Sequence, residues 1–429
     1  MSKSIDINSS TYKEREDAAA AAFPEGTISE VGQKVQRKIS NSGDLDPGGF
    51  SARPPLAMVP TGMPSIDHIL GGGVSEGQSI GIGGMYGGGK SILLLQIASN
   101  LAAAGAAVLY ATPELTPDEV FARQAARYAD SVGSVAEGMD GRPDVPGFGE
   151  IRRMRGRDGE SLSQPQRRVI KESLERWTED VGPRFSLLRY KEGDSLEALI
   201  DGVDLFYELA HGDRLKVIVV DPIQRLAPMR QDGMSDIQFD SILKSEHERI
   251  ALVATQIKDL TDEDRTVVLF GSDANAGVTD PNESASAGFR GGAKVGNAAT
   301  TMFFISKPRP NENYGEFSER VIGERGYVLG GSPFLDENGA ELDEVTMNKL
   351  GCAPVIISTF KNREGPGGYI GAHMRGAYSR FVDCAREIGL QADEPETPAS
   401  NVVSITPQVE SGGVLDSDDW DDTKPDFEF

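Results

Sequence analysis

The sequence predicts an α/β fold in which a mainly parallel central sheet is flanked by helices. Short apolar runs have the length and composition of buried strands, and helical patterns separate the earlier runs, as crossovers between parallel strands require. A glycine-rich segment also joins the first run directly to an apolar helical run, ILLLQIASNLAAA. The expected strands are Ser79–Gly83, Ala107–Ala111, Phe185–Leu188, Lys216–Val220, Val267–Phe270, Thr301–Ile305 and Pro354–Thr359.

The glycine-rich segment after the first strand reads GMYGGGKS and is a complete G-x-x-x-x-G-K-S phosphate-binding loop. Its glycines let the backbone turn tightly and point several N–H groups at a polyphosphate, at the N-terminus of the following helix. We expect Lys90 to contact the β and γ phosphates and the Ser91 hydroxyl to hold Mg²⁺. The expected nucleotide contacts are Gly84, Gly87, Gly88, Gly89, Lys90, Ser91 and Ile92, with ATP and Mg²⁺ as cofactors.

Two carboxylates follow later strands. Asp221 ends the apolar run LKVIVVD, a position from which it can hold the water shell of Mg²⁺. Glu114, in VLYATPEL, follows the strand after the phosphate-loop helix and is the candidate general base that orients or deprotonates the attacking water.

Composition shifts divide the chain into three parts. Residues 1–55 are rich in Ser, Asp, Gly and charge and are expected to form a largely flexible arm, with helix-prone pieces at Asp17–Phe23 and Ile28–Ile39. Residues 56–390 are expected to form the α/β domain, with an inserted loop at Asp130–Gly159 before a helix at Gln164–Asp180. Residues 391–429 are expected to be a disordered acidic tail.

Overall composition limits the partners and the cellular location that are expected for this chain. The formal net charge is -24, so any DNA-binding region must be a local basic patch or a channel made by assembly. Two cysteines without paired spacing argue against a disulfide framework and against a structural zinc site, which fits a reduced, cytoplasmic location. No signal core precedes the domain, and the one long apolar stretch is interrupted by polar residues, so no membrane association is expected.

Several motifs together resemble the DnaB-type hexameric replicative helicases. They are TGMPSIDHILGGGVSEGQ, GGMYGGGKS, VLYATPEL with Arg123 and Arg127 after it, VIVVDPIQRL and ISTFKNREGPGGYI, and they cover about two thirds of the chain. The resemblance implies a RecA-like P-loop NTPase core and an ATP-dependent DNA helicase that moves on single-stranded DNA as a hexamer during replication. DPIQRL is similar to the family's D-Y-L-Q-L motif and places Gln224 on its glutamine, so the resemblance implies that Gln224 also contacts the nucleotide.

KNREGP is the most discriminating of these motifs. In the family a K-x-R-x-G-P hairpin reaches the nucleotide of the next subunit, so the resemblance implies that Lys361 and Arg363 contact phosphate in trans, with Arg363 as the arginine finger. The alternation of the two cations along an extended run supports this independently, because it places them on one face. A lone subunit should then hydrolyse ATP poorly.

The chain departs from the family pattern at three places. LFGSDANAG replaces S-Q-L-x-R, so Ser272 or Asp273 stands where the family has a phosphate-sensing glutamine. RGGAKVGNAATT keeps Arg290, Gly291 and Gly292 but lacks the family's acidic residues. Only about 55 residues precede the ATPase region, in place of a globular N-terminal domain, which suggests a phage- or plasmid-encoded protein whose Ile28–Ile39 helix packs on a neighbour.

Two loops are candidates for contact with single-stranded DNA. RLAPMRQDGMSD carries Arg225 and Arg230, and the small, glycine-rich segment Ser272–Lys294 carries Arg290 and Lys294 near its end. The acidic, aromatic end LDSDDWDDTKPDFEF resembles tails that dock on replication partners, so a polymerase, a primase or a loader is an expected partner.

Two other functional classes remain open at this point. A RecA- or RadA-like recombination ATPase would form filaments on single-stranded DNA, and a KaiC-like regulatory ATPase would act on a protein client, which suits the acidic charge.

Overall fold

The computed structural model describes residues 51, 56–131, 145–156, 159–209, 215–231, 233–264, 266–275, 289–309, 312–323, 328–329, 333–334, 347 and 351–384. The expected helical pieces at Asp17–Phe23 and Ile28–Ile39 and the acidic tail at 391–429 lie outside these residues. The division into arm, ATPase domain and tail therefore stays a prediction.

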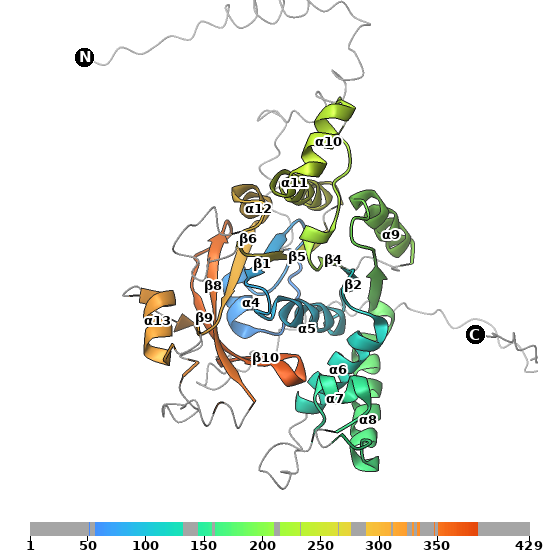
Figure 1. Cartoon of the computed structure of the whole chain (residues 1–429), viewed down its shortest axis with the longest axis vertical. Coiled ribbons are helices and arrows are strands. Elements are labelled where there is room, and N and C mark those ends of the chain that lie inside the picture. The colour runs from blue at the N-terminus through green and yellow to red at the C-terminus, as the bar shows by residue number, and fades with distance from the viewer. Residues whose placement is uncertain are drawn as a thin grey trace, which may run out of the picture. The chain divides into compact units, whose positions relative to one another are not determined.

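One ten-stranded sheet forms the centre of the fold (Figure 1). Its strands lie in the order β10-β9-β8-β6-β1-β5-β4-β2-β3, and the short β7 pairs with β9. The strands are β1 (Ser79–Gly84), β2 (Ala107–Thr112), β3 (Phe185–Arg189), β4 (Lys216–Val220), β5 (Val267–Asp273), β6 (Thr301–Ser306), β7 (Val328–Leu329), β8 (Ala353–Asn362), β9 (Tyr369–Arg375) and β10 (Arg380–Asp383).

The sheet has a parallel part and an antiparallel part. All neighbours from β6 through β1, β5, β4 and β2 to β3 are parallel, whereas β8, β9 and β10 extend the sheet beyond β6 as antiparallel strands. Every strand expected from the sequence is present, with ends that differ by a few residues. The expected α/β class with a mainly parallel sheet is therefore confirmed.

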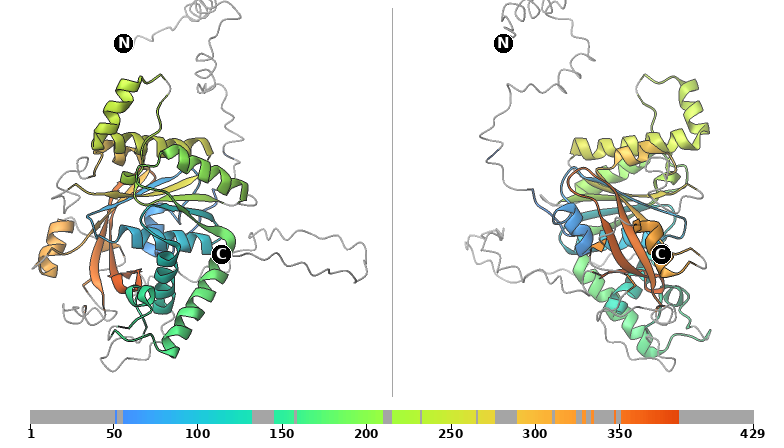
Figure 2. Two further views of the ribbon diagram at one scale, coloured as in Figure 1. Left: turned by 45° about the vertical axis from the view of Figure 1, so that its right-hand side comes forward. Right: turned by 90° about the vertical axis from the view of Figure 1, so that its left-hand side faces the viewer.

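Helices cover both faces of this sheet. The helices are α4 (Pro64–Leu70), α5 (Lys90–Ala103), α6 (Pro117–Ser131), α7 (Phe148–Arg153), α8 (Gln164–Val181), α9 (Leu196–Leu209), α10 (Asp236–Lys244), α11 (Glu246–Asp264), α12 (Ala293–Ala298) and α13 (Tyr314–Ile322), with short 3₁₀ turns η2 (Gly182–Arg184), η3 (Ile223–Arg225) and η5 (Gly376–Tyr378). Helices α6, α7 and α8 lie at one end of the fold, and α10 and α11 at the other (Figures 1 and 2).

Strand β4 shows why the central runs are apolar at consecutive positions. Val217 and Val219 pack into the core that contains α4 and α5, while Ile218 and Val220 pack on the other face against α9, α11 and α12. A strand between two layers of helices has no polar side. Both faces are therefore closed, and only the ends of the strands remain open for a site.

Helix α7 departs from the sequence expectation, which places an inserted loop over Asp130–Gly159. Helix α6 continues to Ser131, and α7 forms within that segment, while residues 132–144 lie outside the described part. The Glu150 carboxylate accepts a 2.7 Å hydrogen bond from the Gly147 N–H, and Ile151 is buried against α6. Six residues are too few to show a helical period; the local capping bond and the packing of Ile151 against α6 stabilise the helix.

The described residues include no helix with the length and apolar character needed to span a bilayer.

Candidate nucleotide-binding site

The phosphate-binding loop joins β1 to α5 at the carboxyl edge of the parallel strands. Gly89 caps α5 with φ 98°, in the left-handed region that favours glycine, and a Cβ there would lie 2.7 Å from the Met374 sulfur. Helix α5 begins at Lys90, so the positive end of a 14-residue helix faces the loop. The backbone is thus shaped for an anion, as the motif predicts.

Lys90 is held at the loop by three acceptors. Its Nζ donates 3.0 Å hydrogen bonds to the carbonyl oxygens of Gly84 and Met85 and forms a 2.9 Å ion pair with Asp273. Asp273 ends β5 and lies opposite Gly84 in the strand register. The Asp273 carboxylate is therefore the anionic partner of Lys90 in this structure.

Asp221 lies directly after β4 and is buried. Its Oδ2 accepts a 2.7 Å hydrogen bond from the Tyr110 hydroxyl. Burial raises the pKa of Asp221, while hydrogen bonds from Tyr110 and from the Ser91 hydroxyl lower it. Ser91 and Asp221 are therefore adjacent.

A hydroxyl beside a carboxylate fits the Mg²⁺ of a nucleotide, which takes one or two protein ligands and completes its shell with phosphate oxygens and water. The described residues contain no group of three or more His, Cys, Asp or Glu residues able to hold a metal without such help. Ser91 and Asp221 thus fit a metal that arrives with the nucleotide.

Glu114 follows β2, and its side chain is half exposed. Its Oε1 lies 3.7 Å from the Arg225 Nε. Burial and the charge of Asp221 raise the pKa of Glu114, while Arg225 lowers it. Asp273 and Lys90 also act on this carboxylate, so it belongs to the same electrostatic cluster as the phosphate loop.

Gln224 and Ser272 connect the ends of β4 and β5. The Gln224 Nε2 donates a 2.9 Å hydrogen bond to the Ser272 Oγ, and both side chains are buried. The Gln224 Oε1 is buried without a hydrogen-bond partner in the described part of the chain. Of the two residues at the position of the family glutamine, Ser272 binds Gln224 and Asp273 binds Lys90.

Lys361 lies near the end of β8 and Arg363 directly after that strand, and both side chains face the end of α12. The Lys361 Nζ donates to the carbonyl oxygens of Gly296 at 2.7 Å, Asn297 at 3.3 Å and Ala299 at 2.5 Å. Arg363 makes one longer bond, 3.4 Å, to the Asn297 carbonyl. Burial and the charge of Arg363 lower the pKa of Lys361 to about 8. Contact with a neighbouring subunit's nucleotide stays a prediction for both residues.

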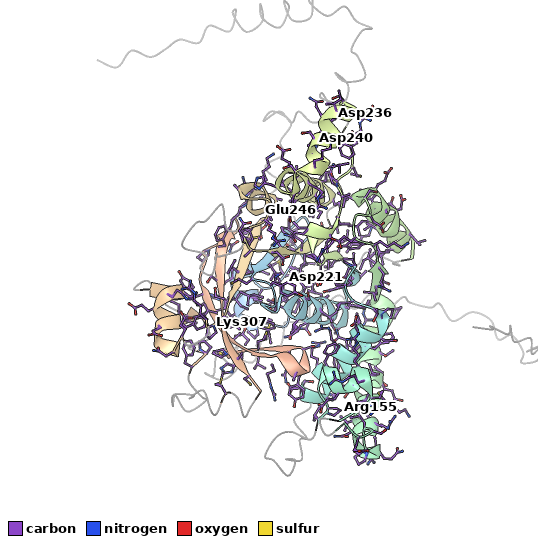
Figure 3. All side chains as sticks on the ribbon, viewed as in Figure 1. Arg155, Asp221, Asp236, Asp240, Glu246 and Lys307 are labelled. Atoms are coloured by element: carbon purple, nitrogen blue, oxygen red, sulfur yellow. The ribbon has the colours of Figure 1, made fainter. Side chains whose placement is uncertain are left out.

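The four candidate DNA contacts do not form one surface. Arg225 pairs with Glu192 at 2.5 Å and faces Glu114, which places it at the nucleotide site. Arg230 pairs with Asp236, and Arg290 lies 3.5 Å from Glu246; both acidic partners are labelled in Figure 3. Lys294 belongs to α12 and lines a cavity of about 360 Å³ together with Gln231, which follows Arg230 in the chain.

The candidate DNA loop that follows β5 is attached at both ends next to the phosphate loop. Residues 276–288 lie outside the described part, but Ala274 and Phe289 form an antiparallel bridge. A Cβ on Gly83 would lie 2.0 Å from a ring carbon of Phe289, so the Phe289 ring packs directly on β1.

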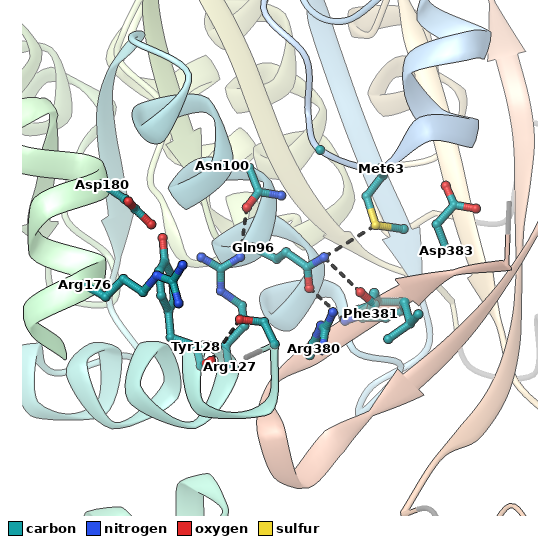
Figure 4. Close-up of a pocket in the computed structure, with 13 residues that line it drawn as sticks. Met63, Gln96, Asn100, Arg127, Tyr128, Arg176, Asp180, Arg380, Phe381 and Asp383 are labelled. Atoms are coloured by element: carbon teal, nitrogen blue, oxygen red, sulfur yellow. Dashed lines mark hydrogen bonds between the residues drawn. The ribbon is translucent and has the colours of Figure 1, made fainter. Parts of the chain in front are cut away.

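A separate cavity of about 480 Å³ lies against the C-terminal half of α5 (Figure 4). Its buried Arg127 donates to Ser99, Asn100 and Gln124, and burial lowers the pKa of Arg127 to about 10. None of the expected site residues lines this cavity.

The sequence reasoning missed Tyr110 and Lys307 at the phosphate end of the site. Tyr110 gives no signal because it lies inside an apolar strand, and Lys307 reaches the loop only through the pairing of β6 with β1. Asp273 is visible in the sequence as a departure from the family pattern, but its ion pair with Lys90 is not.

Part of the chain matches known proteins in sequence. Residues 59–133 match the family model of the KaiC ATPases. The DNA repair protein RadA of Campylobacter jejuni is 57% identical over 49 residues, and RadA of Listeria monocytogenes is 45% identical over 56 residues. These matches cover 11% and 13% of this chain and 11% and 12% of the relatives, so the chain spans about a tenth of the length of the curated relatives it matches.

Solved structures match over most of the chain. An ATPase domain of known structure superposes with a TM-score of 0.53 at 15% identity, over 84% of this chain and 99% of that domain. A DnaB-like replicative helicase, described together with its interactions with primase, superposes with a TM-score of 0.52 at 14% identity, over 87% of this chain and 74% of the helicase. At such low identity the likeness shows the fold.

The chain thus has the RecA-like P-loop ATPase fold found in the ATPase domains of DnaB-like helicases. This confirms, at the level of fold, the resemblance that the motifs indicate. The fold and the loop geometry imply the use of a nucleotide and Mg²⁺.

Proposed function

We propose that this chain is an ATP-driven DNA helicase or translocase that moves on single-stranded DNA as a hexameric ring during DNA replication. One observation carries the proposal: Lys90, Ser91, Asp221 and Glu114 converge at the phosphate loop of a fold shared with helicase ATPase domains. The site contains the groups that NTP hydrolysis requires. The fold suggests that hydrolysis is coupled to movement on single-stranded DNA.

The residues would divide the chemistry as follows. Phosphate oxygens replace Asp273 on Lys90, while the loop N–H groups bind the remaining phosphate charge. Ser91 and Asp221 would hold Mg²⁺, which neutralises charge between the phosphates. Glu114 would orient the attacking water and accept its proton.

Arg363 would complete the site of the neighbouring subunit as an arginine finger. The bonding pattern favours Arg363 over Lys361 for reaching outward, because Lys361 donates to three carbonyls and Arg363 to one at 3.4 Å. A guanidinium supplied from a neighbour makes hydrolysis depend on assembly.

DNA contact would come from Arg230, Arg290 and Lys294, near α10, α11 and α12. Arg225 is a weaker candidate because it already pairs with two carboxylates, those of Glu192 and Glu114. The acidic tail would dock on a polymerase, a primase or a loader by charge complementarity.

The test is ATP turnover and unwinding of a forked duplex, with and without single-stranded DNA. The proposal predicts that single-stranded DNA stimulates turnover and that unwinding requires ATP, with Lys90→Ala as the inactive control. Turnover without DNA stimulation and without unwinding would contradict the helicase and favour the KaiC-like regulatory ATPase, which the match over residues 59–133 supports.

A second candidate is a RadA-like recombination ATPase, supported by the local identity to two RadA proteins. Electron microscopy with a non-hydrolysable ATP analogue, with and without single-stranded DNA, separates the two: closed rings support the helicase, and helical filaments support the recombination ATPase.

A further inference from the structure

A second lysine reaches the phosphate loop from the side opposite the carboxylates. Lys307 directly follows β6, which pairs with β1 on the edge away from β5. Its Nζ donates a 2.8 Å hydrogen bond to the carbonyl oxygen of Gly87, at the exposed tip of the loop. Lys90 and Lys307 are therefore both held by loop carbonyls, Lys90 at the start of the loop and Lys307 at its tip.

Lys307 differs from Lys90 in having no counter-ion. Lys90 pairs with Asp273, whereas no carboxylate in the described part of the chain pairs with Lys307. Its side chain is partly buried, and burial together with the charge of Lys90 lowers its pKa. A partly buried ammonium next to another cation is unfavourable on its own, so an anion bound at the loop would relieve the repulsion.

The order of the strands separates the charges around the loop. Asp273 on β5, Asp221 after β4 and Glu114 after β2 all lie on one side of β1, and Lys307 after β6 lies on the other. Figure 3 labels Asp221 and Lys307 on these two sides. Ser91 and Asp221 would hold Mg²⁺ on the carboxylate side, and Lys307 is a cation that the chain places on the β6 side.

We propose that Lys307 is a second phosphate-binding lysine, which binds the terminal phosphate of the nucleotide through oxygens that face away from the carboxylates. This inference rests on the proposed nucleotide site and adds a specificity element to it: preference for a triphosphate over a diphosphate. Hydrogen bonds to charged groups are strong enough to change affinity by tenfold or more.

The experiment measures equilibrium binding of ADP and of a non-hydrolysable ATP analogue, in Mg²⁺, to the full-length protein. Lys307→Met keeps the apolar stem and removes the charge, Lys307→Arg restores a cation, and Lys216→Met is the matched control. Lys216 is also a partly buried lysine of the same sheet, but it begins β4 and so lies at the opposite edge of the strands.

Lys307→Met should weaken binding of the ATP analogue by tenfold or more and binding of ADP by threefold or less. Lys307→Arg should recover most of the loss, and Lys216→Met should bind both nucleotides like the wild type. Wild-type affinity in Lys307→Met, or equal losses for both nucleotides that arginine does not restore, would overturn the role of Lys307. Failure of the wild-type protein to bind either nucleotide would instead refute the nucleotide site itself.

Discussion

Replacing Asp273 by asparagine should tighten nucleotide binding, because the Lys90–Asp273 ion pair must open before a phosphate can take the place of the carboxylate. At 2.9 Å and an effective dielectric constant of about 20, the Coulomb attraction is about 6 kcal/mol. Desolvation and side-chain entropy offset most of it, and exposed pairs retain about 0.2–1 kcal/mol. The Lys90 side chain is 8% exposed and that of Asp273 24%, so we expect about 1–2 kcal/mol for this pair.

That free energy corresponds to about five- to thirtyfold tighter binding. Isothermal titration with ADP and with a non-hydrolysable ATP analogue measures the change. Asp273→Glu keeps the charge and should bind much like the wild type, and Asp236→Asn, which removes an exposed carboxylate paired with Arg230, controls for the change in net charge. An Asp273→Asn protein with unchanged or weaker affinity would refute the competition between carboxylate and phosphate, and weaker affinity would show that Asp273 contributes to binding.

Three further predictions concern catalysis. Glu114→Gln should lower single-turnover hydrolysis about 10²–10⁴-fold while nucleotide affinity changes little; a parallel loss of affinity would argue against a general base. Because the pKa of Glu114 is raised and its carboxylate must be ionised to act, turnover should fall on acidification at a higher pH than an ordinary glutamate gives, and Arg225→Gln should move this limb of the pH profile higher still; a limb that stays in place would contradict the assigned cause. Arg363→Ala should lower turnover of the assembled protein about 10³-fold or more, and mixing it with Lys90→Ala subunits should restore part of the activity; no recovery would exclude action across subunits.

The local parts of the site follow from the sequence because each depends on neighbouring residues. The phosphate loop needs only glycines, a lysine and a serine between a strand and a helix, and Asp221 needs only the end of an apolar run. Strand β4 can be predicted from the sequence for the same reason, since every position from Val217 to Val220 is apolar.

The remaining features depend on pairings between segments far apart in the chain. The Lys90–Asp273 pair requires β5 beside β1, and the approach of Lys307 requires β6 on the other edge. Strand β9 is not predicted from the sequence because YIGAHMR mixes apolar, small and charged residues. It forms by pairing with β8. Strand order is a property of the whole fold, so single motifs do not reveal it.

The bridge between Ala274 and Phe289 also bears on how the length of the connection between them affects the fold. A segment that leaves and returns at one point costs little extra free energy when it grows, about 0.6 kcal/mol for each doubling of its length. The positions of β1 and β5 therefore do not depend on the length of this connection, because Ala274 and Phe289 hold its two ends beside Gly84 and Gly83.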